Sequence, residues 1–332
     1  MKKLFIPLFL SVLFATGLSA QSIANYAFTT STTSTLESMS SGTTQLIGAS
    51  STDVASALTN IGFTFYYMGT PYTQFSVNSN GQLRLGSTVI SNTGITNAVL
   101  NAPLIVPMSA ENLISGIGKV HYKVFGSAPS RYLTVEWRNL DVPNPNYRHN
   151  LCTIQVILYE TSGIIKFRYA NTDYNHASST SKATFISSSN TATTVKYIGT
   201  DLASAINGYP IVTYPWSNTN AYLLYSRLYT FTPPGVPMAP TWKATPMTIV
   251  SANGMTLNWN DNSTNETGFQ VYRSDDGGAT YSNVATLPAN SSNYAATGLQ
   301  PPLSYHWKIV AVNEGSTSTT SDLIQPIAPT VA

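Results

Sequence analysis

The chain has 332 residues, one cysteine and only 9% charged side chains, with 16 Lys+Arg against 14 Asp+Glu. The excess of two positive charges comes from Lys2 and Lys3, so the rest of the chain is formally neutral. A neutral chain lacks the basic surface that nucleic acid or anionic lipid requires, which excludes both as expected partners. The lone Cys152 excludes an intrachain disulfide and a cysteine-built zinc site.

Residues 1–20 have the pattern of an export signal. Lys2 and Lys3 precede a mostly apolar stretch, and Ala20 supplies a small residue before Gln21. The stretch is too short and interrupted to span a bilayer, and no later one is long enough. We therefore expect cleavage after Ala20 and a mature chain that is not inserted in a membrane. We expect it outside the cell, at the cell surface or in the periplasm.

Two hairpins stand out in a sequence rich in Ser, Thr, Asn, Tyr and Val, a composition typical of strands and turns. In residues 75–85, alternating apolar residues flank Asn80-Gly81, which predicts a type I′ turn. The second hairpin joins residues 152–159 to 164–169. Alternation along its first strand predicts that Cys152 points inward as a small hydrophobe rather than serving as a reactive thiol.

Six further strands are predicted at residues 61–66, 119–125, 132–137, 183–186, 195–198 and 222–231. Together with the hairpins they are sufficient for two packed sheets, so we predict an all-β fold with a β-sandwich over residues 21–232. Prolines are concentrated in residues 233–239, which predicts a stiff, extended linker between domains. A second β-sandwich is expected over residues 240–332.

Residues 240–332 resemble the fibronectin type III family, an immunoglobulin-like β-sandwich. Thr256–Trp259, Gly268–Arg273 and Tyr305–Asn313 match three of its strands. The resemblance implies that Trp259 lies between the sheets and that the Tyr305 hydroxyl bonds backbone near a corner of the fold. The family's integrin-binding Arg-Gly-Asp tripeptide is absent, since the corresponding loop reads Asn313-Glu314-Gly315-Ser316. The resemblance therefore implies a spacer or accessory domain of a secreted or surface protein, and it does not identify a ligand.

The N-terminal part resembles, less specifically, β-sandwich modules of secreted Bacteroidota proteins and nidogen-type extracellular domains. The resemblance rests on Ile61–Phe65, Asn78–Gly81, Leu158–Glu160 and Gly163–Tyr169. It implies no assigned active site. Many such secreted proteins end in a further sorting domain that is not found in this sequence, so surface attachment is left open.

A search for catalytic motifs gives no convergent set. The histidines occur singly, at His121, His149, His176 and His306. No nucleophile elbow, phosphate loop or zinc-protease motif occurs, so we expect no enzyme activity, no cofactor and no metal. The enzyme alternative would need two carboxyl groups facing each other across a cleft. The candidates for such a pair in the first domain are Glu111, Glu136, Asp141, Glu160 and Asp173.

The segment Asp261–Glu266 concentrates oxygen ligands and invites a calcium-site interpretation. It lacks the glycine and the distal glutamate of a calcium-binding helix–loop–helix, and it lies where a loop between two fibronectin strands belongs. Asp, Asn, Ser and Thr also satisfy turn backbone, so a loop is favoured. Arg273–Gly278 is interpreted as a turn for the same reason.

Three aromatic residues in proline-marked loops, Tyr147, Tyr214 and Trp216, are the candidate ligand-binding residues. Their rings could stack on a sugar or a peptide, or they could simply cover the ends of the sandwich. We expect a secreted or envelope-associated, non-catalytic interaction or adhesion protein whose partner is an extracellular protein or a glycan. The alternative is a carbohydrate-binding protein or an accessory part of a secreted glycan-degrading system.

Overall fold

The computed structural model describes residues 22–92, 102–109, 113–141, 151–170, 183–188, 195–198, 205–207, 226–251, 253–300, 304–318 and 323–325. Within these residues the regular structure is almost entirely strand, which confirms the all-β prediction, and a short 3-10 helix, η1 (Ile23–Asn25), precedes the first strand. No helix in the described part of the chain is long and apolar enough to cross a membrane.

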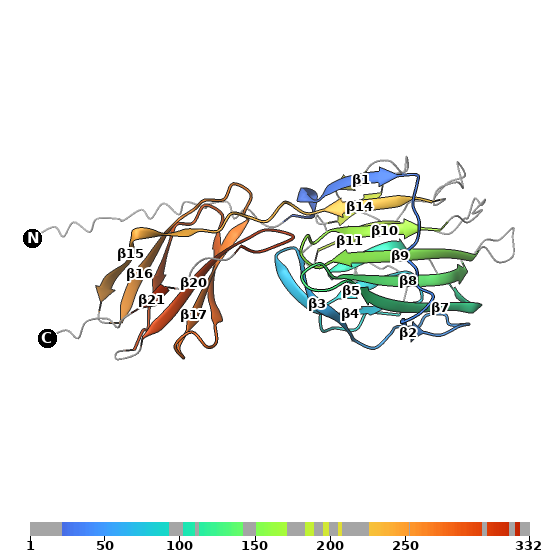
Figure 1. Ribbon diagram of the computed structural model, residues 1–332, viewed down its shortest axis with the longest axis horizontal. Coiled ribbons are helices and arrows are strands. Elements are labelled where there is room, and N and C mark those ends of the chain that lie inside the picture. The colour runs from blue at the N-terminus through green and yellow to red at the C-terminus, as the bar shows by residue number, and fades with distance from the viewer. Residues whose placement is uncertain are drawn as a thin grey trace, which may run out of the picture.

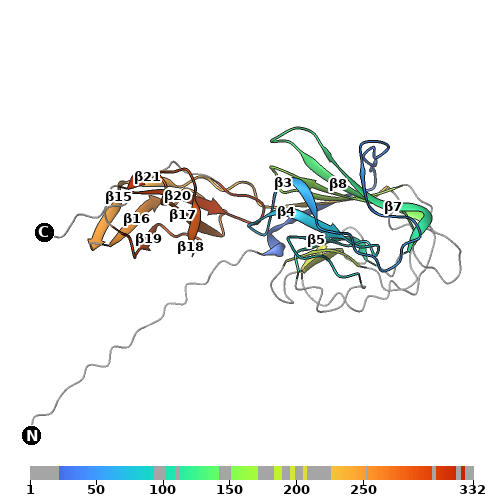
Figure 2. The same cartoon turned by 90° about the horizontal axis from the view of Figure 1, so that it is seen from below.

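Two seven-stranded antiparallel sheets form the first domain, and they lie in two layers (Figures 1 and 2). The first sheet contains, in spatial order, β1 (Ala27–Ser31), β14 (Leu228–Thr232), β10 (Ile165–Tyr169), β9 (Leu151–Tyr159), β8 (Tyr132–Asp141), β7 (Leu113–Phe125) and β2 (Thr44–Ile47). The second contains β13 (Ala205–Asn207), β12 (Val195–Ile198), β11 (Ala183–Ser187), β6 (Leu104–Ser109), β5 (Leu83–Leu85), β4 (Thr70–Val77) and β3 (Thr59–Tyr67).

Alternating side chains from the two sheets form the core of this domain. Ile61 and Phe63 of β3 are buried while their neighbours in sequence are exposed, which is the alternation of a strand with one solvent-exposed face. Trp137 enters the same core from the first sheet. Cys152 is buried among these apolar residues, which confirms the inward orientation predicted for it.

The turn between β4 and β5 differs from the predicted type I′ turn. Asn78 N–H donates to the Gln82 carbonyl at 3.0 Å, so the loop is three residues long. Gly81 has a φ of +79°, and Asn80 is not among the residues with positive φ. A type I′ turn needs two such residues, whereas a three-residue loop needs one, at its last position. The Asn80-Gly81 pair thus predicted the position of the turn correctly, but the predicted turn type was wrong.

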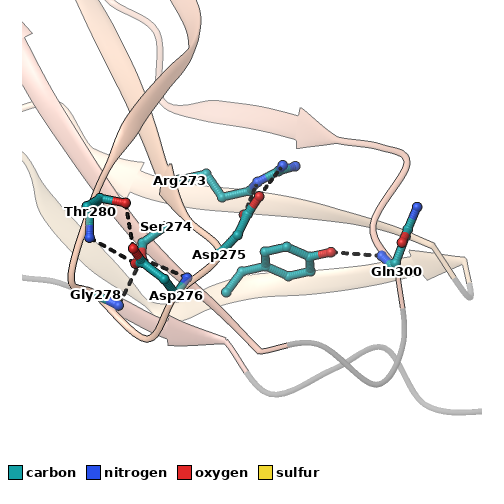
Figure 3. A network of polar contacts seen from close by, with 8 residues as sticks. Arg273, Ser274, Asp275, Asp276, Gly278, Thr280 and Gln300 are labelled. Atoms are coloured by element: carbon teal, nitrogen blue, oxygen red, sulfur yellow. Dashed lines mark hydrogen bonds and ion pairs between the residues drawn. The ribbon is translucent and has the colours of Figure 1, made fainter.

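The second domain has a three-stranded and a four-stranded sheet, as in the fibronectin type III fold. The smaller sheet contains β15 (Thr241–Ser251), β16 (Gly254–Asn260) and β19 (Asn293–Ala296), and the larger contains β18 (Ser282–Pro288), β17 (Gly268–Ser274), β20 (Tyr305–Val312) and β21 (Leu323–Gln325). Trp259 is fully buried between them. The Tyr305 hydroxyl accepts the Gln300 N–H at 2.9 Å (Figure 3).

The two domains lie end to end (Figure 1) and meet through the loop Asn313–Ser316, which we call the junction loop. The Glu314 carbonyl accepts the N–H of Gly69, at the turn between β3 and β4, at 3.1 Å. It also accepts the Tyr26 hydroxyl at 3.3 Å. We call the end of the first domain whose turns contact the junction loop its proximal end. The opposite end of the first domain is its distal end.

Candidate functional site

The described strand ends that flank the candidate aromatic residues lie at the distal end. Asp141 pairs with Leu151, at the ends of β8 and β9 farthest from the junction loop. Leu228, which begins β14, pairs with Arg168 near the distal end of β10. Tyr147, Tyr214 and Trp216 themselves lie outside the described residues.

A buried polar turn supports this distal end. The side chains of Asn78, Asn80 and Gln82 are at most 1% exposed. Asn78 Nδ2 donates to the Ser91 carbonyl at 2.9 Å, and Asn80 Nδ2 donates to Asp53 Oδ1 at 3.0 Å. Because these amides bond neighbouring segments, they fix the base of the distal loops rather than face a ligand. Sequence reasoning missed this role, since the pattern predicted only a type I′ turn.

A second polar cluster crosses the outer face of the first sheet, and its members are consecutive partners on β7, β8 and β9. His121 Nε2 lies 2.8 Å from Glu136 Oε1, and Gln155 Nε2 donates to Glu136 Oε2 at 2.6 Å. All three side chains are buried. A histidine beside a carboxylate is the pair that general acid–base catalysis uses, provided that a substrate can reach it.

Residues 32–43, here called the strap, cover this cluster on their way from β1 to β2 (Figure 1, blue). The Glu37 N–H donates to Gln155 Oε1 at 2.8 Å, and Arg168 donates to both the Thr35 carbonyl at 2.9 Å and Glu37 Oε1 at 2.7 Å. The strap therefore bonds Gln155 of the cluster, whereas His121 Nδ1 is buried and has no hydrogen-bond partner within the described residues. The position of the strap favours a structural role, in which the polar row holds the strap on the sheet.

A second described candidate carboxylate of this domain, Glu160, is also paired. Glu160 accepts three hydrogen bonds from Arg131: Nε at 2.9 Å and the backbone N–H at 3.1 Å donate to Oε2, and Nη2 donates to Oε1 at 2.5 Å. These bonds lower the pKa of its carboxyl group. Within the described residues, no three His, Cys, Asp or Glu side chains form a group that could hold a metal ion. Glu111, Asp173, His149 and His176 lie outside the described residues.

An aromatic ladder lies at the proximal end of the same face. The rings of Phe125 and Tyr132 stack with centroids 5.0 Å apart, and Tyr159 continues the stack at 5.4 Å. Lys123 lies over the Phe125 ring and Lys166 over the Tyr159 ring, at 4.7 and 4.9 Å from the centroids. The ring faces are therefore shared with one another and with lysines, so the ladder is not a flat platform for a sugar.

The polar loops of the second domain bond to their own backbone. Asp276 accepts hydrogen bonds from Ser274 and from the N–H and hydroxyl of Thr280, which hold the pKa of its carboxyl group far below its usual value (Figure 3). Arg273 donates to Asp275 beside it at 2.7 Å. This geometry agrees with the turn predicted for Arg273–Gly278.

The proposed calcium-site segment also forms a loop. Asp261 Oδ1 accepts the Ser263 N–H at 3.0 Å, and Glu266 Oε1 accepts the Asn290 N–H at 3.1 Å. Burial, and secondarily the nearby Glu266 carboxylate, raises the pKa of Asp261. The two carboxylates thus serve as acceptors for loop backbone, as the loop interpretation predicted.

The junction loop contains a buried carboxylate, Glu314, that the sequence analysis did not predict. Glu314 is fully buried, and its Oε1 accepts the Ser22 N–H at 3.0 Å and the Asn25 amide at 2.7 Å. In the second domain, this loop occupies the position where the fibronectin family's Arg-Gly-Asp tripeptide would lie. Here it is enclosed by the first domain instead of facing solvent, so the second domain cannot present this loop to a partner while the domains are docked.

These features define a two-domain all-β module in which a buried loop of the second domain contacts the proximal end of the first domain. The model of the NIDO-related family matches residues 25–233, and that of the fibronectin type III domain matches residues 239–327. The chain therefore belongs to the NIDO-related family and carries a C-terminal fibronectin type III domain. The two findings confirm the nidogen-type and fibronectin type III resemblances predicted from the sequence.

No curated protein matches the chain. Among solved structures, it is similar to a Fn3-like protein from Clostridium thermocellum, with 27% identity, coverage of 26% of this chain and 90% of that chain, and a TM-score of 0.23. The sixth fibronectin type III domain of human fibronectin type III domain containing protein 3 is 18% identical, with coverage of 30% and 90% and a TM-score of 0.24. A pectate lyase from Pectobacterium carotovorum is 18% identical, with a TM-score of 0.24, and the chain spans only 28% of its length.

Proposed function

We propose that this protein is an exported, non-catalytic interaction module that binds an extracellular protein or glycan through the distal end of its NIDO-related domain. The observation that carries the proposal is the burial of Glu314 in the junction loop. Because this loop holds the second domain against the proximal end, the fibronectin type III domain acts as a spacer. The distal end of the first domain then faces away from it, and loops at the end of a rigid sandwich are suited to recognition.

The absence of catalysis is part of the proposal, and the state of the described polar groups supports it. Glu136 is bonded to His121 and Gln155 beneath the strap, and Glu160 is bonded to Arg131. Each carboxylate thus has a structural role. Export is proposed from the signal-like pattern of residues 1–20, and location outside the inner membrane follows from it.

A glycan array probed with the full mature chain tests the proposal, followed by titration of variants against any hit. We expect Trp216→Ala to weaken glycan binding at least tenfold with an unchanged melting temperature, since stacking on a sugar face would be lost. Tyr281→Ala is the matched control, because this aromatic residue lies in the fibronectin type III domain, where Lys308 covers its ring. Equal loss in both variants would contradict the distal site. A blank array from a folded chain would direct the search to protein partners.

A further inference from the structure

Strand β7 contains a bulge near the distal end of the first sheet. Ile114 pairs with Leu140, next to the distal end of β8, and Lys119 pairs with Arg138. Residues 115–118 of β7, here called the β7 bulge, therefore stand opposite a single residue of β8. Bulges change the direction of side chains and are frequent beside binding sites.

The β7 bulge is held in place from both ends. The Ile114 side chain is buried in the core of the first domain. Asn139, with a φ of +52°, donates its side-chain amide to the Ile117 carbonyl at 3.3 Å. A Cβ added to Gly118 would lie 2.7 Å from the Arg138 carbonyl oxygen, so the close approach of the two strands requires glycine. The backbone around Ile117 is thus fixed by its neighbours.

The bulge exposes an aliphatic side chain. Ile117 is 73% exposed, more than any other large apolar residue among those described. A single exposed apolar residue is ordinary on a protein surface. This one belongs to a backbone segment that is already ordered, so its contact with a partner would cost little conformational entropy.

Two cations lie beside the bulge without a counter-charge. Lys119 and Arg138 are two residues from His121 and Glu136, so all four side chains belong to the outer face of the sheet. Within the described part of the chain, neither Lys119 nor Arg138 forms a side-chain ion pair or hydrogen bond. Like charges directly opposite on adjacent strands destabilise a sheet. Folding therefore gives no reason for this pair.

We propose that Lys119, Arg138 and Ile117 bind an acidic segment of an extracellular partner protein. A carboxylate of the partner bonds the two cations, and a neighbouring apolar side chain packs on Ile117. This inference deepens the proposed function and rests on it, because it assigns a partner class and contact residues next to the distal end.

Charge complementarity carries the choice of a carboxylate. An arginine binds a carboxylate with two parallel hydrogen bonds, and a negative charge between the two cations removes their repulsion. Beyond residue 20 the positive and negative charges of the chain balance, so two cations do not make a surface for nucleic acid or a membrane. Ile117 favours a protein over a glycan, since an aliphatic side chain has no flat ring to stack on a sugar.

A displayed library of random peptides, panned on the full mature chain, supplies the probes. Enriched peptides are synthesised and titrated by fluorescence anisotropy against wild type and four variants. Lys119→Glu and Ile117→Ser change the proposed surface. Lys243→Glu and Val250→Ser are the matched controls, because they make the same changes at exposed positions of β15 in the second domain.

We expect the enriched peptides to share an acidic residue beside an aliphatic one. Lys119→Glu should weaken their binding about tenfold or more, because it places a negative charge beside the partner's carboxylate. Ile117→Ser should weaken it about fivefold or more through lost apolar contact. Neither control should change the affinity. Lys119→Glu should melt at or above the wild-type temperature, since it places opposite charges across the strands, which excludes unfolding as the cause.

Three results would overturn the proposal. They are a library that yields no binder, enriched peptides without an acidic residue, and equal affinities of the Lys119→Glu and Lys243→Glu variants. Binding of acidic glycans on the array, lost in Lys119→Glu while no peptide binds, would assign the surface to a glycan and also overturn it.

Titration of the same peptides against Trp216→Ala separates this inference from the proposed function. Loss of binding in Trp216→Ala but not in Lys119→Glu would support recognition through the distal loops and overturn the role of the cations. Loss in Lys119→Glu with full binding in Trp216→Ala would support this inference and contradict the candidate aromatic residue.

Discussion

The contact between Gly315 and Pro233 gives the sharpest test of domain docking. A Cβ added to Gly315 would lie 2.3 Å from both Cβ and Cγ of Pro233. Carbon atoms in favourable contact lie about 3.5–4.0 Å apart, so Gly315→Ala requires the junction loop and the linker to separate by more than 1 Å. Overpacking of this kind typically costs about 1–3 kcal/mol.

Undocking sets the upper limit of that cost. Four polar contacts join Glu314 to the first domain, through Ser22, Asn25, Tyr26 and Gly69. At about 1 kcal/mol net for each hydrogen bond, separation of the domains would cost about 4 kcal/mol. The variant takes whichever route costs less free energy, so we expect the junction to lose about 1–3 kcal/mol of stability while each domain keeps its own core.

Gly235→Ala is the matched control, because a Cβ there meets no atom within 4 Å. Small-angle X-ray scattering and limited proteolysis of residues 233–239 would compare the two variants, and calorimetry would report the transitions of the two domains separately. We expect Gly315→Ala to increase the rate of linker cleavage about tenfold or more and to shorten the average molecule. Indistinguishable scattering and cleavage in the two variants would refute the docked geometry.

Four substitutions in the fibronectin type III domain give further predictions, all measured by chemical denaturation. Trp259→Ala should destabilise the domain by about 3–5 kcal/mol, because it leaves a cavity in the core, and unchanged stability would contradict the burial of this ring. Tyr305→Phe should cost about 1 kcal/mol, since only the Gln300 N–H loses its acceptor. Asp276→Asn should destabilise at neutral pH, and the difference should disappear as pH falls through the lowered pKa of Asp276. Asp261→Asn should have the opposite sign: the raised pKa of Asp261 means that its charged form opposes folding, so the variant is more stable at neutral pH and equal to wild type below about pH 4, the usual pKa of aspartate.

Local patterns were sufficient to predict most of the strands. Alternation and a short turn located β9 and β10, and the inward orientation of Cys152 followed from the period of two. The core tryptophan strand and the corner tyrosine indicated the fibronectin type III fold because both features lie within short motifs. The predicted strand at residues 222–231 overlaps β14, which begins at Leu228, and residues 222–225 lie outside the described residues.

Features that depend on register between distant strands could not be predicted. His121, Glu136 and Gln155 are separated by 15 and 19 residues and share a row only because β7, β8 and β9 pair in one particular register. Burial of the Asn78–Gln82 turn depends on segments that cover it from elsewhere in the chain. A turn-forming dipeptide indicates a reversal of the chain, but it carries no information about what packs against that reversal.

The contact between the two domains could not be predicted from the sequence either, although it fixes their relative orientation. The prolines at residues 233–240 predicted a spacer, and a stiff spacer alone would leave the second domain free to choose its orientation about either end of the linker. Docking removes that freedom because Glu314, more than 280 residues from Ser22, bonds the start of the first domain. The start of the first domain thus meets the second domain at one buried carboxylate, and the distal end of the first domain is left as the surface that a rigid, outward-pointing module can present.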